Sequence, residues 1–410
     1  MVHRGSYMAN GNESRSDKIK KFKGLETIAA RYGEYIDSNI GNVITPIFQT
    51  STYFFPTEDP TTWEGEVPDG TYIYLRYGNP TERAVTDKLA RMEGAEKGML
   101  FSSGMAAIST TLLTYLSKGD HIVSVEDVYG GSFNLMQNTF PRMGIDVSLV
   151  DSTDTQKIVD SINDKTKMVY LESPTNPLLK IIDIPEVVKM AHEAGTMVVI
   201  DNTFATPVNQ NPIQMGVDLV IHSCTKFLNG HSDVLAGAVV GPAKDMEAIW
   251  NQRIIFGGSP DPIAAFLLLR GMRTLVLRMK KHSENGMAMA QFLEDHPRVD
   301  GVYYPGLESN PQHSLAKKML RDFGGIVSFN VKGSRKDAEK VLRSFELFAM
   351  ATSLGGVESL ASMPLNSSHH ALSPEDRARM GIRDQLIRLS VGIEDIEDLK
   401  EDMDRALNRF

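Results

Sequence analysis

Short runs of apolar residues between positions 121 and 223 constrain the fold of this chain more than any other feature. The runs are "HIVSV", "DVSLV", "KMVYLE", "TMVVID" and "DLVIHS", and helix-like stretches such as "IPEVVKMAHEAG" separate several of them. Apolar strands that alternate with helices are typical of a mostly parallel sheet covered on both faces. The sequence from about 84 to 241 therefore predicts an α/β domain.

The length of 410 residues predicts a second domain, because one hydrophobic core rarely serves more than roughly 250 to 300 residues. Residues 261–296 are mostly helical in pattern and lead into "GGIVSFNV" and "QLIRLSVGIE", which read as strands, and two amphipathic helices. We divide the chain into an N-terminal arm (1–75), a large α/β domain (76–265) and a smaller α+β C-terminal domain (266–410). The prolines of the arm predict little regular structure there.

The charge and composition exclude several classes of function. A net charge of −9 and a pI near 5.6 argue against a nucleic-acid binder. No window approaches the ~18 continuous apolar residues of a membrane helix, and the basic run at 18–24 lacks the apolar neighbour of a signal peptide. Cys224 is the single cysteine, so neither an internal disulfide nor a cysteine metal cluster is expected. We expect no metal and a cytoplasmic location.

Polar clusters follow three of the apolar runs at the points where the predicted strands end. They are "ESPTN" at 172–176, "DNT" at 201–203 and "SCTK" at 223–226. In open parallel sheets, ligands bind beyond the carboxyl ends of the strands. The three clusters therefore predict one shared site.

Lys226 is the residue of this site that most needs an explanation. A lysine beside a buried strand end can lose its charge and attack a carbonyl to form a Schiff base, although a lone lysine there is more often a solvated surface residue. The hydroxyls of Ser223 and Thr225 can donate hydrogen bonds to a phosphate. Ser103 and Gly104, in "FSSGMAAI", lie at a predicted strand-to-helix turn that favours an anion, or that serves only as a helix cap and a packing glycine.

Asp201 ends the run "TMVVID". Its carboxylate can simply cap the next turn. If the phosphate belongs to pyridoxal phosphate, Asp201 instead pairs with the ring nitrogen and keeps it protonated. A lysine, an aspartate and a phosphate cradle are the parts that this cofactor requires.

With these parts the chain resembles the Cys/Met-metabolism family of pyridoxal-phosphate enzymes, which includes cystathionine γ-synthase, cystathionine γ- and β-lyases, methionine γ-lyase and O-acylhomoserine sulfhydrylases. The resemblance runs from about residue 25 almost to the end. It implies fold type I, the aspartate aminotransferase-like fold. The motifs that carry it, in family order, are "YLRYGNPT", "SSGMAA", "DVYGGS", "ESPTNP", "DNTFATP", "DLVIHSCTKFLNGHS", "SLGGVESL" and "IRLSVGIED".

The resemblance implies roles around the cofactor ring. Lys226 would form the Schiff base and later move protons as the freed amine. Asp201 would bind the ring nitrogen, and Thr203 would support the ring. Tyr129 would stack on the ring and act as an acid or base, although by itself it reads equally as a core aromatic near a loop.

The resemblance also implies two anion sites. Arg388 would bind the substrate α-carboxylate, assisted by Asn176 and Ser353; taken alone, an arginine in a strand is usually part of a surface ion pair. The residues that would hold the cofactor phosphate are Ser103, Gly104, Met105, Ser223 and Thr225, joined by Tyr74 and Arg76 from a neighbouring subunit. Because this site is completed across an interface, we expect an inactive monomer and a homo-oligomer, a tetramer built from two catalytic dimers, in which the arm contributes to the neighbour's site.

The reaction depends on the pocket walls. Methionine γ-lyases carry a cysteine where this chain has Gly131, and cystathionine-handling γ-enzymes place an arginine where it has Asn134. Thr352 matches none of the common branches, whereas "SLGGVESL" favours the cystathionine γ-enzymes. We therefore expect γ-elimination or γ-replacement on a sulfur amino acid or homoserine derivative, of the cystathionine γ-lyase or γ-synthase type.

Two alternatives remain open. Within enzymes, the chain could be a methionine γ-lyase or an O-acylhomoserine sulfhydrylase. Outside them, it could be a non-catalytic pyridoxal-fold binding protein, but such a protein is expected to have lost Lys226, Asp201 or Arg388, and all three are present.

Overall fold

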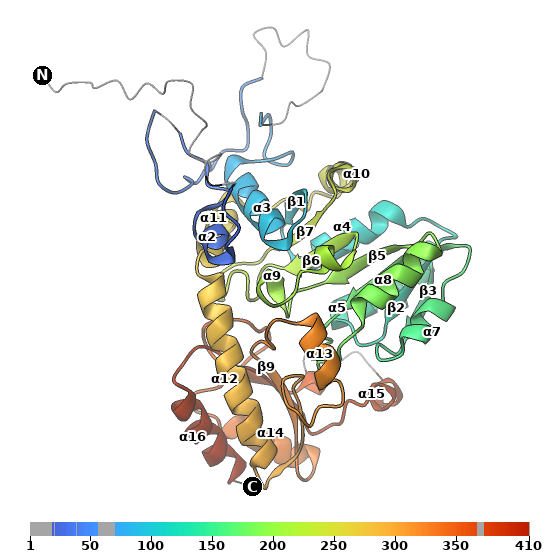
Figure 1. Cartoon of the computed structure of the whole chain (residues 1–410), viewed down its shortest axis with the longest axis vertical. Helices are drawn as coiled ribbons and strands as arrows, with labels where there is room; N and C mark the ends of the chain where they lie inside the picture. The colour runs from blue at the N-terminus through green and yellow to red at the C-terminus, as the bar shows by residue number, and fades with distance from the viewer. Residues whose placement is uncertain (1–18, 20, 38, 56–69, 367–372, 410) are drawn as a thin grey trace, which may run out of the picture.

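Two β-sheets organise the chain in the computed structural model, which describes residues 19, 21–37, 39–55, 70–366 and 373–409 (Figure 1). Most of the basic run at 18–24 falls within these ranges, whereas residues 1–18 and the proline-rich part of the arm at 56–69 lie outside them. The arm contains one described helix, α2 (Leu25–Arg31). The domain limits at 75 and 265 remain predictions.

The larger sheet has seven strands in the order β1-β7-β6-β5-β4-β2-β3. β7 alone runs in the opposite direction to the other strands, and the remaining pairs are parallel. The predicted mostly parallel sheet is therefore confirmed. The central strands are buried on both faces, which explains why their sequences are apolar throughout. The strands are β1 (Lys97–Phe101), β2 (His121–Val125), β3 (Asp146–Val150), β4 (Thr166–Glu172), β5 (Met197–Asp201), β6 (Leu219–Ser223) and β7 (Gly237–Gly241).

Helices cover this sheet, as Figure 1 shows. α4 packs on β6 and β7, α3 on β1 and β7, α8 on β5, and α7 on β2. The helices of this part are α3 (Pro80–Glu93), α4 (Gly104–Tyr115), α5 (Gly130–Asn134), α6 (Phe140–Met143), α7 (Thr155–Asp160), α8 (Ile184–Glu193), α9 (Thr206–Asn209), α10 (Ala243–Phe256) and α11 (Pro262–Met272), with a π-helical turn at Leu135–Thr139 and a 3₁₀ turn at Pro212–Met215.

The smaller sheet has five strands in the order β10-β11-β12-β9-β8, antiparallel except for the β10–β11 pair. It confirms the expected α+β part of the chain. Its core is separate from that of the larger sheet. The elements are β8 (Val299–Tyr303), α13 (His313–Met319), β9 (Ile326–Val331), α14 (Arg335–Ser344), β10 (Ala349–Met350), β11 (Leu360–Ser362), a 3₁₀ turn (Pro364–Asn366), α15 (Pro374–Met380), β12 (Leu386–Ser390) and α16 (Ile396–Leu407).

The helix α12 (Leu275–Asp295) joins the two cores. Its first half contributes Met279 to the core of the larger sheet, and its second half contributes Met289 to the core of the smaller one. The predicted long helix over 261–296 is interrupted at 273–274, which separates α11 from α12. Gly271 lies two residues before this break, and a Cβ there would come within 2.2 Å of the Asn229 carbonyl oxygen.

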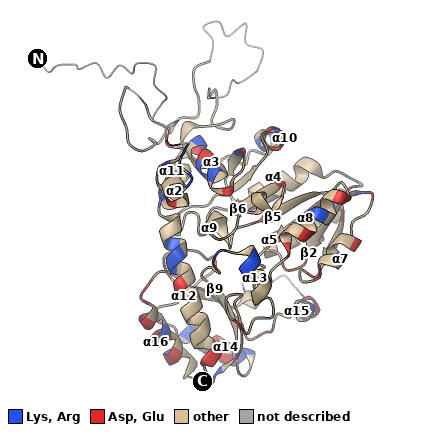
Figure 2. Cartoon of the chain, viewed as in Figure 1, with Lys and Arg blue, Asp and Glu red and all other residues tan. Residues whose placement is uncertain are grey.

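The surface carries charges of both signs. Figure 2 shows Lys and Arg interspersed with Asp and Glu on α8, α14 and α16. Within the described ranges, no helix is both long and apolar enough to cross a membrane.

Arg278, on α12, fixes the chain that follows Lys226. It is 5% exposed, and its guanidinium donates hydrogen bonds to the carbonyl oxygens of Phe227 (2.7 Å), Leu228 (3.3 Å) and Gly271 (2.8 Å). Gly230 lies against this guanidinium with φ +74°, and a Cβ at that position would come within 1.9 Å of Nη1. The bridging helix therefore holds the segment that carries the candidate nucleophile.

We expect Arg278→Leu to lower the free energy of unfolding by about 3 kcal/mol, because three buried carbonyl oxygens lose their donor. Urea unfolding followed by circular dichroism measures the change. The matched control is Arg343→Leu, which removes an exposed partner of Glu339 and should cost less than about 0.5 kcal/mol. Equal costs for the two variants would contradict the anchoring role of Arg278.

Candidate active site

The register of three parallel strands brings the predicted polar clusters together. Glu172 pairs with Asp201 across β4 and β5, and Asp201 pairs with Ile221 across β5 and β6. The segments after these residues therefore leave the sheet at one edge. Lys226 follows β6 by three residues, in a turn in which its N–H donates to the Ser223 carbonyl oxygen.

Lys226 lies in a largely buried position and contacts the C-terminal part of the chain. Its Nζ donates a hydrogen bond to Ser353 Oγ at 2.7 Å. Burial, together with the nearby Arg388 guanidinium, lowers the pKa of Lys226 to about 8. A substantial fraction of the amine is then neutral near pH 8, which is the state that attacks a carbonyl.

Arg388, on β12, is a buried cation held by neutral oxygens. Nη1 donates to Asn176 Oδ1 at 3.0 Å, and Nη2 donates to the Ser353 carbonyl oxygen at 3.1 Å. Ser353 adopts a left-handed conformation with φ +82°. Arg388 Nε is buried and has no hydrogen-bond partner among the described residues. This arrangement suits a carboxylate ligand, because a guanidinium binds one with paired, charge-assisted hydrogen bonds.

Asp201 is buried and oriented by a neutral partner. Its Oδ1 accepts a hydrogen bond from the Thr203 N–H at 2.9 Å, and Thr203 Oγ1 accepts one from the Ser223 N–H at 2.8 Å. Burial raises the pKa of Asp201. Within the described part of the chain, no cation donates a hydrogen bond to this carboxyl, so a protonated ring nitrogen would supply the charge that it lacks.

Ser103 and Gly104 lie where the sequence places an anion. Ser103 is the N-cap of α4, and its Oγ accepts from the Ala106 N–H at 3.0 Å. Gly104 faces Ser223 so closely that a Cβ would lie 3.0 Å from the Ser223 hydroxyl oxygen. A cradle with this little side-chain bulk fits a phosphate group. Thr225 is differently placed, because its Oγ1 already donates to and accepts from the backbone of Ala236.

Tyr129 precedes α5, with its side chain 43% exposed. Its backbone N–H donates to Glu172 Oε2 at 2.7 Å. The ring lies over Gly131, where a Cβ would be 2.5 Å from Tyr129 Cε1 and 2.8 Å from Met105 Sδ. The predicted stacking residue, Met105 and Gly131 are therefore in contact distance of one another, and any larger residue at 131 would move the ring.

The described side-chain contacts of Tyr74 and Arg76 are with each other and with Tyr77. The Arg76 guanidinium lies 5.2 Å from the ring centre of Tyr74 and 5.4 Å from that of Tyr77. The Arg76 carbonyl oxygen accepts hydrogen bonds from Arg253 and Ser259 rather than from the groups around Lys226. Arg76 Nε is buried without a hydrogen bond among the described residues.

Two of the three residues expected to set specificity, Asn134 and Thr352, are exposed. Asn134 lies at the end of α5, where its Oδ1 accepts from Asn138 Nδ2 at 2.6 Å. Thr352 is exposed and directly precedes Ser353.

Sequence reasoning missed several polar groups beside this site. Glu172 was recognised only as the start of a strand-end cluster, and its equal register with Asp201 is the signal that could have assigned it. On β6, His222 Nε2 lies 2.7 Å from Glu93 Oε1, which also accepts from Asn202 Nδ2 at 2.9 Å. Nothing in the sequence links Glu93 to His222, because they are 129 positions apart.

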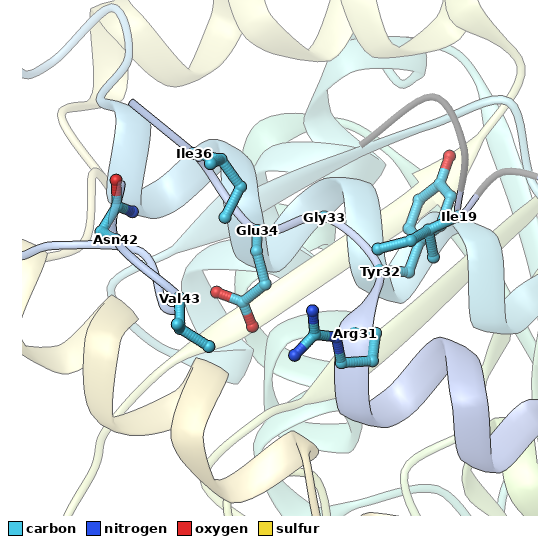
Figure 3. Close-up of a pocket in the computed structure, with 8 residues that line it drawn as sticks. All are labelled: Ile19, Arg31, Tyr32, Gly33, Glu34, Ile36, Asn42 and Val43. Carbon is cyan, nitrogen blue, oxygen red and sulfur yellow. The ribbon is translucent and has the colours of Figure 1, made fainter. Parts of the chain in front are cut away.

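A pocket elsewhere on the chain does not compete with this site. It lies in the arm between Arg31, Tyr32, Glu34 and Val43, and Figure 3 shows Arg31 and Glu34 extending toward the same space. It offers about 30 Å³ to water-sized molecules, room for roughly two waters. In the described ranges no group of three or more His, Cys, Asp or Glu side chains is placed to hold a metal ion.

The match to a known family identifies the cofactor of the chain. The sequence pattern of the family described as "Cys/Met metabolism PLP-dependent enzyme" matches residues 26–408. The chain belongs to this family. The resemblance, the fold type and the cofactor are thereby confirmed: this Cys/Met-metabolism enzyme uses pyridoxal phosphate. The non-catalytic alternative finds no support among its relatives.

Three relatives illustrate the range of reactions in the family. A cystathionine β-lyase of Coxiella burnetii is 45% identical over 386 residues, 93% of this chain and 97% of the relative. An L-methionine γ-lyase of Fusobacterium nucleatum subsp. nucleatum is 40% identical, over 95% of this chain and 99% of the relative. The crystal structure of a cystathionine γ-synthase of Xanthomonas oryzae pv. oryzae in complex with cystathionine has a TM-score of 0.89 and 38% identity, over 94% of this chain and 98% of that chain. The chain is thus an enzyme of sulfur amino-acid metabolism.

The contact between Gly131 and the Tyr129 ring can be tested directly. We expect Gly131→Ala to weaken pyridoxal phosphate binding by about tenfold, because the added methyl group displaces the ring and Met105. Titration of the apoprotein with the cofactor measures the change. The control is Gly258→Ala, whose Cβ would find its nearest atoms at 3.4 and 3.6 Å. If both variants bind the cofactor like the original chain, the ring does not need the space over residue 131.

Proposed function

We propose that this enzyme catalyses γ-elimination or γ-replacement on a sulfur amino acid or homoserine derivative, with cystathionine as the leading substrate. One observation supports an α-amino-acid substrate above all. Ser353 receives the Lys226 amine on its hydroxyl and the Arg388 guanidinium on its carbonyl oxygen. A single residue therefore sets the spacing between the amine that reacts and the cation that would bind the α-carboxylate.

The chain's own residues have distinct tasks in this proposal. Arg388, oriented by Asn176, binds the α-carboxylate. Lys226 moves protons at Cα and Cβ of the substrate once its amine is free. Asp201, held by Thr203, keeps a proton on the ring nitrogen. Bound pyridoxal phosphate supplies the electron sink for the negative charge that develops at these carbons.

The phosphate of the cofactor is assigned to the segment around Ser103, Gly104 and Met105, with Ser223 on the facing strand end. The close approach of Gly104 to Ser223 supports this assignment. The Thr225 hydroxyl can donate to the phosphate only if it gives up its hydrogen bond to the Ala236 carbonyl oxygen.

The residues that line the pocket determine which substrate binds and which of its bonds is cleaved. The motif "SLGGVESL" and the similarity to a cystathionine γ-synthase crystallised with cystathionine support a cystathionine γ-enzyme. The second candidate is a methionine γ-lyase, favoured by a relative of that name at 40% identity. Gly131 counts against it, because methionine γ-lyases carry a cysteine at the position where this chain has a glycine.

We also propose that the enzyme is a homo-oligomer, a tetramer of two catalytic dimers. Large apolar side chains of the arm are exposed in the single chain, and the Phe54 side chain is 99% exposed. Clustered exposed apolar residues mark interaction surfaces. In the assembly, Tyr74 and Arg76 would complete the phosphate site of the neighbour. The buried free thiol of Cys224 is consistent with the cytoplasmic location that we propose.

The products formed from L-cystathionine test the proposed reaction. We expect cysteine, 2-oxobutyrate and ammonia, the products of γ-elimination with uptake of one water, identified by mass spectrometry after incubation with purified holoenzyme. Lys226→Ala should lower the rate by at least about a thousandfold, because the proton carrier is lost. Homocysteine and pyruvate would instead indicate cleavage at Cβ. Turnover of methionine alone, or of an O-acylhomoserine with a thiol, would overturn cystathionine as the substrate.

The lowered pKa of Lys226 predicts how cofactor uptake depends on pH. Because only the neutral amine reacts, the rate at which the apoprotein attaches pyridoxal phosphate to Lys226 should rise with pH and reach half its maximum near pH 8. Borohydride reduction at set times, followed by mass spectrometry of the peptide that contains Lys226, measures this rate. A midpoint near 10.5, the ordinary value for lysine, would contradict the effect of burial.

A further inference from the structure

Glu172 is a buried carboxyl that none of the proposed catalytic steps uses. It ends β4, directly opposite Asp201 in the register of the sheet, and is 5% exposed. Its described hydrogen bond is the one that Oε2 accepts from the Tyr129 N–H, at 2.7 Å. This bond joins the rigid end of a central strand to the segment that carries the ring proposed to stack on the cofactor.

Two other carboxyls, Asp127 and Glu126, each accept a hydrogen bond from a cationic side chain, whereas Glu172 does not. Asp127 Oδ2 accepts from Lys180 Nζ at 2.7 Å and from Ser152 Oγ at 2.8 Å. On the same strand end, Glu126 Oε2 accepts from Arg379 Nε at 3.0 Å. Among the described residues, no cation donates a hydrogen bond to Glu172, although the Arg388 charge acts on it from a distance.

The surroundings of Glu172 favour its neutral form. Burial raises the pKa of Glu172 well above its usual range, and the carboxylates of Asp201 and Asp127 raise it further, whereas the hydrogen bond from the Tyr129 N–H and the Arg388 charge lower it. Two adjacent buried carboxyls do not both ionise readily. The hydrogen bond from the Tyr129 N–H needs only an acceptor oxygen on Glu172, which the neutral carboxyl also offers.

The Tyr129 segment needs such an anchor. Tyr129 is 43% exposed, so neighbouring side chains cover its ring only in part. Gly130 and Gly131 follow directly, and glycine allows the backbone more conformations than any other residue. The hydrogen bond from the Tyr129 N–H to Glu172 restrains the backbone on the N-terminal side of the tyrosine.

We propose that Glu172 is a positioning residue that acts through Tyr129: its side-chain oxygen fixes the Tyr129 backbone, and thereby the ring, over the bound cofactor. The inference rests on the proposed role of Tyr129. It predicts that the length and the acceptor oxygen of residue 172 matter, and that its negative charge does not.

Two conservative variants separate these properties. Glu172→Gln keeps the length and an acceptor oxygen but cannot ionise, whereas Glu172→Asp keeps the carboxyl but is one methylene shorter and no longer reaches the Tyr129 N–H. The readouts are the dissociation constant of pyridoxal phosphate from the apoprotein and the circular dichroism of the bound cofactor in its visible band, which reports a fixed ring environment. We expect Glu172→Gln to bind within about twofold of the original chain, and Glu172→Asp to bind about tenfold more weakly with a smaller dichroic band.

The same pair at the neighbouring strand end is the control. Glu126→Gln and Glu126→Asp alter a carboxyl that contacts Arg379 rather than Tyr129, and both should leave the dichroic band unchanged. Thermal unfolding of each apoprotein shows whether any loss is only a loss of folding.

Two results would overturn the inference. The first is normal cofactor binding by Glu172→Asp, which together with a loss in Glu172→Gln would indicate a role for the charge. The second is equal losses in both variants. Tyr129→Leu separates this failure from that of the proposed function. If Tyr129→Leu binds the cofactor normally, the stacking role itself is wrong; if Tyr129→Leu is impaired and Glu172→Asp is not, only the role of Glu172 fails.

Discussion

The parallel pairing of β4, β5 and β6 is the constraint on which the rest of the site depends. Their register places Glu172 and Asp201 side by side and releases the chain toward Lys226 at the same edge. A shift of one residue in any of these strands would turn its polar terminal side chain to the opposite face. The apolar cores of the strands therefore do more than stabilise the fold, because their burial pattern specifies which side chains meet at this edge of the sheet.

Burying the ionisable groups of this site costs free energy, because charged groups lose their hydration. The pKa values of its cations and of its carboxyls are shifted toward the neutral form. Lys226 and Arg388 are both cations in a largely buried region, and burial lowers the pKa of each. On the other side of the site, burial raises the pKa of Asp201 and of Glu172. Backbone and amide groups orient these charges without neutralising them, as Thr203 does for Asp201. A zwitterionic amino acid and an anionic cofactor bring the charges that complete such a site.

Much of the fold could be predicted because its signals are local. The apolar runs predicted the strands β2 to β6, and the alternation with helices predicted their parallel arrangement, whereas the antiparallel β7 was not foreseen. One long bridging helix was expected, but the chain forms two, with a break at 273–274. Gly271, just before the break, packs closely against the Asn229 backbone, a contact between residues far apart in the sequence. At the site, Lys226 and Asp201 could be predicted as functional residues, because Asp201 ends a recognisable strand and Lys226 comes shortly after another. Glu172 could not, since its role depends on a hydrogen bond to Tyr129, 43 positions away. The Thr225 hydroxyl was assigned to the phosphate from its position alone, and its bonds to Ala236 could not be foreseen.

The contact of Ser353 with Lys226 and Arg388 joins residues that belong to different sheets. Lys226 follows a strand of the larger sheet, Arg388 lies on a strand of the smaller one, and α12 connects the two cores. The distance between the Lys226 amine and the Arg388 guanidinium is therefore a property of how two separate cores are aligned. Substitutions on α12, remote from any substrate atom, can then alter which amino acids fit, and the diversity of substrates in this family need not arise only from residues that line the pocket.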